Sequence, residues 1–64
     1  MEKWSLKALR VNAGYTQKTA CKKIGVTQKT LSSWENGLTY PNQKQIEQIC
    51  SVYNVAYDRI NFVG

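Results

Sequence analysis

Hydrogen-bonding side chains recur at helical spacing between residues 28 and 36. A glutamine amide can pair with adenine through two hydrogen bonds, a lysine ammonium can donate to guanine, and a serine hydroxyl can serve several bases or a phosphate. None of the residues that share the outward face is acidic, so none would repel a phosphate. The pattern favours reading of base edges in duplex DNA by four residues, with Asn36 at the far end of the same face: Gln28, Lys29, Ser32 and Ser33.

Two lysines stand where a helix selected only for stability would carry an acid. Lys18 and Lys29 each fall in the first turn of an expected helix. A cation there opposes the helix dipole and costs about 0.3–1 kcal/mol when exposed. A phosphate at the same helix end would reverse that sign, because the free backbone N–H groups, the dipole and the ammonium would all point at one anion. These positions therefore favour DNA over an inert basic surface.

The charge of the 64-residue chain is strongly basic and unevenly placed. Nine Lys and Arg residues face four Asp and Glu residues, giving a net charge of +5. Seven of the nine cations lie between Lys3 and Ser33, a stretch that contains no acid. Such a balance indicates a polyanion or an anionic membrane surface as partner. A solvated basic face without a partner is the alternative reading.

The composition argues against several other classes of protein. There is no histidine, and the two cysteines, Cys21 and Cys50, are too few for a structural zinc site or a disulfide framework. We therefore expect no metal, no cofactor and free, buried thiols in a reducing cytoplasm. No apolar run approaches the roughly 18 residues needed to span a bilayer, and the amino-terminal residues do not form a secretory signal.

Catalysis and membrane-surface binding are also disfavoured. The carboxylates of Glu35, Glu47 and Asp58 are scattered, and no glycine-rich phosphate loop is present. The basic residues do not oppose one broad apolar face on a single helix, as an interfacial helix would require. We expect a protein that is not an enzyme and does not bind membranes.

Capping residues and apolar spacing predict one all-α domain over residues 1–64. Five helices are expected, with no strand: residues 5–13, 17–24, 28–36, 42–53 and 57–62. Ser5, Thr16 and Thr27 are the expected amino-terminal caps of the first three, while Gly25 and Asn54 are expected to end the second and fourth. The inward residues of the expected helices are Leu6, Leu9, Ala13, Ala20, Cys21, Ile24, Leu31, Trp34, Ile46, Ile49, Cys50 and Tyr53.

The second and third expected helices are separated by only three residues, Gly25, Val26 and Thr27. Glycine permits the sharp backbone turn, and valine can pack between the two helices. This sequence pattern predicts a helix-turn-helix over about residues 16–36. An ordinary helical hairpin has the same pattern, so the outward side chains of the third expected helix decide between the two.

The chain resembles the Cro/repressor-type (XRE-like) helix-turn-helix family of phage and bacterial transcriptional regulators. The resemblance extends over about residues 6–60 and depends on the following residues: Leu9, Arg10, Gly14-Tyr15-Thr16-Gln17, Ala20, Ile24-Gly25-Val26-Thr27, Leu31, Ser33-Trp34-Glu35-Asn36-Gly37, Pro41, Val55, Asp58 and Ile60. It implies a compact five-helix, lambda-repressor-like domain. Such a domain docks its third helix in the major groove, usually as a two-fold homodimer on a pseudo-palindromic operator.

The resemblance also implies roles for individual residues. Gln17 would bind a phosphate and brace the third helix, and Asn36 would contact phosphate beyond it. Thr27 would open the recognition helix beside the phosphate backbone. Arg10 and Glu35 fall where related repressors form a structural ion pair. From its place in the loop before Pro41, Tyr40 is a further candidate for the sugar-phosphate backbone, with packing as the alternative, and Lys18 joins the phosphate set through its helix end.

Apolar residues near the carboxyl end leave a second interpretation open. Tyr57, Ile60, Phe62 and Val63 would either close the core or form a small dimer seam. The leading functional hypothesis is a sequence-specific DNA-binding transcriptional regulator, of the phage or mobile-element repressor type. The alternative is an antitoxin or other protein-interaction module that uses this carboxyl-terminal apolar surface.

Overall fold

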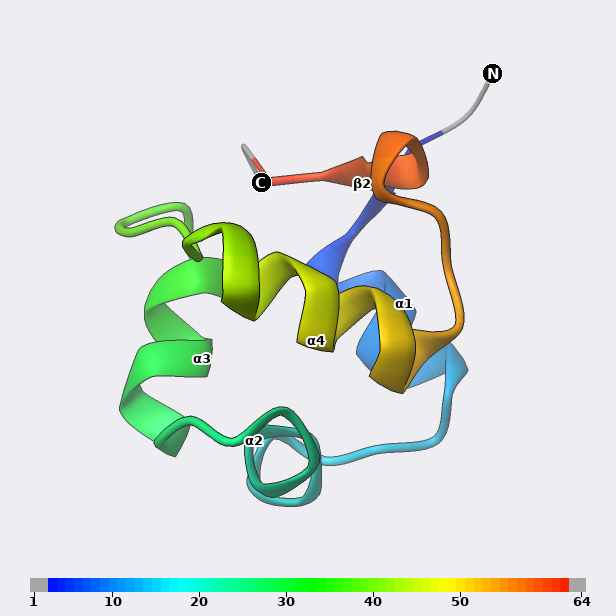
Figure 1. Cartoon of the computed structure of the whole chain (residues 1–64). Coiled ribbons are helices and arrows are strands. Elements are labelled where there is room, and N and C mark those ends of the chain that lie inside the picture. Colours follow the sequence, from blue (N-terminus) through cyan, green and yellow to red (C-terminus); the bar gives the residue numbers. More distant parts are fainter. Residues whose placement is uncertain (1–2, 63–64) are drawn as a thin grey trace.

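The computed structural model describes residues 3–62, which fold mainly into helices (Figure 1). The elements follow one another as β1 (Trp4–Ser5), α1 (Leu6–Asn12), α2 (Gln17–Ile24), α3 (Gln28–Glu35), α4 (Gln43–Tyr53), the 3-10 turn η1 (Tyr57–Arg59) and β2 (Ile60–Asn61). The helical character predicted from the sequence is confirmed. The count of five helices is wrong, because four α-helices lie within the described residues.

The predicted fifth helix is instead a single turn followed by a strand. Ala56 precedes η1 without a side-chain cap, and the chain becomes extended at Ile60. Strand β2 pairs in parallel with β1, so that Trp4 lies opposite Ile60. Burial of Ile60, which is 4% exposed, shows that this residue closes the core. Tyr57 is exposed and Phe62 partly buried, whereas Val63 lies outside the described residues.

The helix boundaries follow from the capping residues. The side chains of Ser5, Thr16 and Thr27 each accept a hydrogen bond from the backbone N–H three residues later. Such a cap satisfies one of the orphan donors at a helix start. Asn54 ends α4 at a φ of 52° in the left-handed region. The first helix is shorter than predicted, because Ala13 is already its carboxyl-terminal cap.

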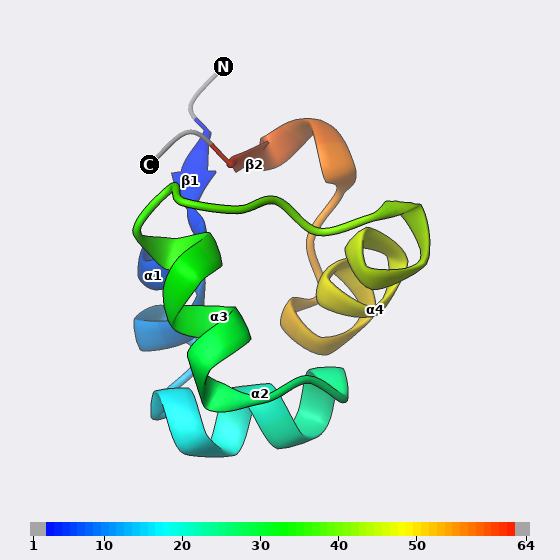
Figure 2. The ribbon, with the colours of Figure 1, turned by 90° about the vertical axis from the view of Figure 1, so that its left-hand side faces the viewer.

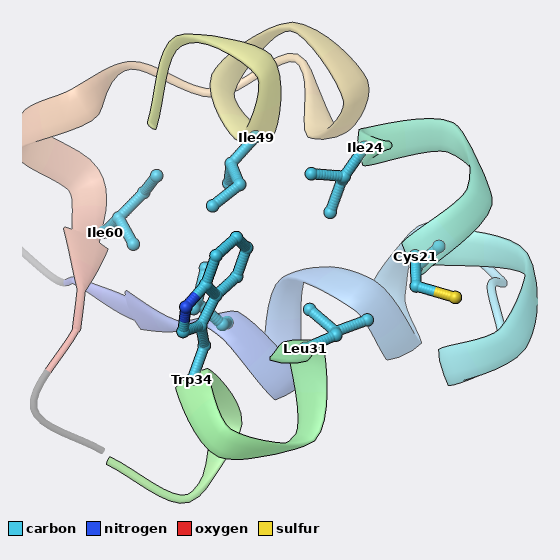
Figure 3. Packing of buried hydrophobic residues seen from close by; sticks show 8 residues of the cluster. Cys21, Ile24, Leu31, Trp34, Ile49 and Ile60 are labelled. Carbon is cyan, nitrogen blue, oxygen red and sulfur yellow. The ribbon is translucent and has the colours of Figure 1, made fainter. Parts of the chain in front are cut away.

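One apolar core joins all four helices (Figure 3). Ile49 of α4 and Ile24 of α2 meet Leu31 and Trp34 of α3, and all four are at most 3% exposed. Burying each such side chain contributes about 1.5–3 kcal/mol. The predicted inward residues Leu6, Ala20 and Cys21 are also buried, whereas Leu9, Ile46, Cys50 and Tyr53 are half-buried and Ala13 is exposed. The core therefore fixes α3 through one side.

Two further structural observations concern the residues from 3 to 62. None of their helices has the length and apolar character needed to cross a membrane. Within the same stretch, no three His, Cys, Asp or Glu side chains form a group that could hold a metal ion, and Cys21 and Cys50 are free thiols.

Candidate nucleic-acid interface

Helices α2 and α3 form the predicted helix-turn-helix. Gly25 adopts a φ of +91°, a left-handed conformation that glycine reaches without penalty. The backbone N–H groups of Gly25 and Val26 both donate to the carbonyl of Cys21, at 2.8 and 2.9 Å. Val26 packs against the core, so the turn is anchored from inside. Figure 2 shows α3 at the front of the molecule with α2 crossing below it.

The outer side of α3 carries the predicted base-reading residues. Gln28 and Lys29, at its amino end, are exposed, whereas Leu31 and Trp34 are 0% and 3% exposed beneath them. The indole of Trp34 is therefore part of the core and not a stacking platform for a base. Ser32 and Ser33 are half-buried, and the hydroxyl of Ser32 accepts a hydrogen bond from the Asn36 amide at 3.4 Å. The amino-terminal turn is thus the most accessible part of this face.

The residues predicted to contact phosphate lie at both ends of α3 and at the start of α2. Lys18, Thr27 and Asn36 are exposed, and Tyr40 is 59% exposed in the loop that follows α3. Gln17 is half-buried at the first position of α2. This exposure is what a backbone contact requires; the roles themselves stay predictions.

A largely buried ion pair ties α3 to α1, as the resemblance implied. Arg10 Nε donates to Glu35 Oε2 at 2.8 Å, and Arg10 Nη2 donates to Glu35 Oε1 at 3.3 Å. The side chains of Arg10 and Glu35 are 12% and 3% exposed. Arg10 Nη1 also donates to the carbonyl of Tyr15 at 2.9 Å, which holds the linker between α1 and α2. The pair thus fixes the orientation of α3 relative to α1.

The start of α2 and the start of α3 carry the same four residues, Thr-Gln-Lys-Thr, at 16–19 and 27–30. The two caps are alike, since Thr16 accepts from the Thr19 N–H at 3.1 Å and Thr27 from the Thr30 N–H at 3.2 Å. The two glutamines differ, because Gln17 Nε2 donates to Glu35 Oε1 at 3.0 Å while Gln28 is exposed. The resemblance implied different roles for the two glutamines, and the fold gives them different environments.

Two tyrosines beside the ion pair form a stack that the sequence analysis did not predict, although it placed Tyr53 inward. The rings of Tyr15 and Tyr53 stack with their centroids 6.4 Å apart, and Lys23 Nζ lies 5.2 Å from the centre of the Tyr15 ring. The Tyr53 hydroxyl is buried without a hydrogen-bond partner. Burial, and next the charge of Glu35, raise the pKa of Tyr53 from 10.0 to about 12.

Replacing Tyr53 by phenylalanine keeps the ring stack and removes the unpartnered hydroxyl. At pH 7 we expect the free energy of unfolding to stay equal or to rise by up to about 1 kcal/mol, because a buried polar group without a partner is unfavourable. Because burial raises the pKa of the Tyr53 phenol on folding, the phenol ionises first in the unfolded chain, so the free energy of unfolding is unaffected by this group below pH 10 and falls as the pH rises to about 12. The natural protein should therefore lose more stability than Tyr53→Phe across that window.

Urea unfolding at pH 7 and between pH 10 and 12 measures both effects. Tyr57→Phe is the matched control, because Tyr57 is 61% exposed and should change neither curve. A loss of more than about 1 kcal/mol in Tyr53→Phe at pH 7 would show that the hydroxyl is paired in solution.

The fold and the exposed face of α3 together define a helix-turn-helix domain of the DNA-binding type. The sequence model of a family described as helix-turn-helix matches residues 6–60 of the chain. The chain therefore belongs to the helix-turn-helix family of Cro/repressor-type transcriptional regulators that its motifs resemble.

Among curated proteins, the chain is similar to the HTH-type transcriptional regulator ImmR of Bacillus subtilis (strain 168). The two are 36% identical over 53 residues, which cover 83% of this chain and 42% of ImmR. The chain thus spans about two fifths of the relative's length. The search of solved structures found no match.

Proposed function

We propose that this protein is a sequence-specific transcriptional regulator that binds double-stranded DNA and reads the major groove with the amino end of α3. One observation carries the proposal: Gln28 and Lys29 are exposed on a helix whose opposite side is locked into the core by Leu31 and Trp34. A rigid helix with hydrogen-bonding side chains on its free side is what a B-form groove accepts. The name of the similar regulator ImmR supports the same function.

Two sets of residues have different roles in the proposed DNA binding. The base-reading set is Gln28, Lys29, Ser32 and Ser33, and the phosphate set is Gln17, Lys18, Thr27, Asn36 and Tyr40. Phosphate contacts supply most of the affinity and make it fall steeply with salt, whereas base contacts supply the preference for sequence. The role needs neither catalysis nor a cofactor or metal. The type of regulator proposed is a phage or mobile-element repressor in the cytoplasm, acting from one domain over residues 1–64.

The carboxyl-terminal face is proposed as the seam of a homodimer on DNA. Tyr57 and Phe62 contact each other there, with ring centroids 6.0 Å apart. They border a hollow of about 330 Å³ that Lys3 and Asp58 also line. Because opposite charges flank one apolar surface, two copies related by a two-fold axis can complement each other. The same exposed Tyr57 supports the alternative of an antitoxin or other protein-interaction module, in which a different protein occupies this face and copurifies with the chain.

Selection from random duplexes tests the function and the dimer together. We expect a pseudo-palindromic consensus with half-sites about one helical turn, roughly 10 base pairs, apart. Gln28→Ala and Lys29→Ala should change the preferred bases, each with a discrimination loss of about 1–3 kcal/mol. Gln17→Ala should weaken all duplexes alike. If no consensus emerges, or if the first two variants retain the natural preference, α3 does not read sequence.

A further inference from the structure

The Glu35 carboxylate lies where α1, α2 and α3 meet, and it accepts three hydrogen bonds from two side chains. Two come from Arg10 and one from Gln17, whose Nε2 lies 3.0 Å from Glu35 Oε1. Glu35 is the last residue of α3 and Gln17 the first of α2, so one buried carboxylate links the end of the recognition helix to the start of its neighbour.

This link leaves part of the Gln17 amide unused. A glutamine amide has two N–H donors and one carbonyl acceptor, and Glu35 engages a single donor. Gln17 is half-buried, so the rest of its amide group is not sealed in the core. The Arg10 guanidinium, 2.8 Å from Glu35, compensates the carboxylate charge and reduces its repulsion of an approaching phosphate.

Gln28 is a built-in comparison for Gln17. Both follow a capping threonine and precede lysine and threonine, and both occupy the first position of their helix. Gln28 is exposed, so its side chain must be ordered by the ligand at the moment of binding. Gln17 is already held before binding, and a pre-ordered side chain loses less conformational entropy when it binds.

We propose that Glu35 is a positioning residue for DNA-backbone binding: it holds the Gln17 amide so that the second N–H is ready to donate to a phosphate. The inference deepens the proposed function and depends on it. It gives the buried pair a role in affinity as well as in the angle of α3. It also predicts that the effects of changing Glu35 and Gln17 on duplex binding are not independent.

A double-mutant cycle with Glu35→Gln and Gln17→Ala measures this dependence on the selected duplex at one salt concentration. We expect Gln17→Ala to weaken binding about tenfold, the loss of one hydrogen bond to a charged group. Glu35→Gln should weaken binding severalfold in the natural protein and less than about twofold in the Gln17→Ala background. Thermal unfolding of every variant shows which variants are folded at the temperature of the binding measurement.

The matched control is the same cycle with Gln28→Ala, whose effect should multiply with that of Glu35→Gln. A second route replaces Arg10 and Glu35 together by methionine, an apolar pair that can keep the fold while removing the acceptor of Gln17. In that background Gln17→Ala should again cost less than about twofold.

The outcomes separate this inference from the proposed function. If the natural protein binds duplex, but Gln17→Ala weakens binding as strongly in the Glu35→Gln background and in the double-methionine background as it does in the natural protein, the two residues act independently. Glu35 is then structural only, and the inference fails. If Glu35→Gln changes the preferred bases as strongly as Gln28→Ala, Glu35 acts through the seating of α3 and the inference also fails. If the natural protein binds no duplex at all, the proposed function fails first.

Discussion

Replacing Lys18 and Lys29 together by glutamate is expected to abolish most duplex binding while making the free protein slightly more stable. Both lysines are exposed in the first turn of their helices, and neither first turn contains an acid. Two lost phosphate contacts and two added like charges should weaken binding on the order of 10²–10³-fold near physiological salt. The slope of log affinity against log salt should fall by about 2. An acid at each helix start should add about 0.3–1 kcal/mol to stability.

Opposite signs for binding and stability make this double variant informative, because a variant that merely unfolds would lose both. Fluorescence anisotropy at several salt concentrations and thermal unfolding measure the two quantities. Lys22→Glu with Lys44→Glu is the matched control: the net charge changes equally, but neither exposed residue lies at the start of α2 or α3. Equal losses in the two double variants would show that net charge, and not contact at the starts of α2 and α3, controls binding.

The helices were predictable because their signals are local. Thr16, Thr27 and Gly25 determine the ends of α2 and α3 through hydrogen bonds and a backbone angle within a few residues. The pairing of β1 with β2 was not predictable. Each strand has two residues, too few for an alternating pattern, and Trp4 meets Ile60 only after the helices between them have packed.

In the candidate site too, the features set by local sequence were predictable and the contacts between distant residues were not. Periodicity alone placed Leu31 and Trp34 inward and so assigned the outer side of α3 to Gln28 and Lys29. The bond from Gln17 to Glu35 joins residues 18 apart and depends on the crossing of α2 and α3. Because Gln17 and Gln28 have the same neighbours, no local argument could assign different environments to them.

Removing Glu35 alone is expected to have the largest effect on the fold. Glu35→Ala leaves the Arg10 guanidinium nearly buried without its carboxylate, and breaking a buried pair in this way costs about 3–5 kcal/mol. A domain near 60 residues buries only roughly 60% of its unfolded surface, and folded proteins have about 5–15 kcal/mol of stability in all. The variant should therefore melt far below the natural protein or be largely unfolded at 37 °C, as followed by circular dichroism.

The double replacement Arg10→Met with Glu35→Met distinguishes two origins of this loss of stability. One is the Arg10 charge left buried without a partner, and the other is a net stabilisation by the ion pair itself. If the penalty is the uncompensated guanidinium, the apolar pair should recover most of the stability that Glu35→Ala loses. Glu47→Ala, at an exposed acid of α4, should change the free energy of unfolding by less than about 0.5 kcal/mol. A loss below about 1 kcal/mol in Glu35→Ala would place the pair in the class of solvent-screened surface pairs. A carboxylate of that kind could not hold the Gln17 amide in one orientation.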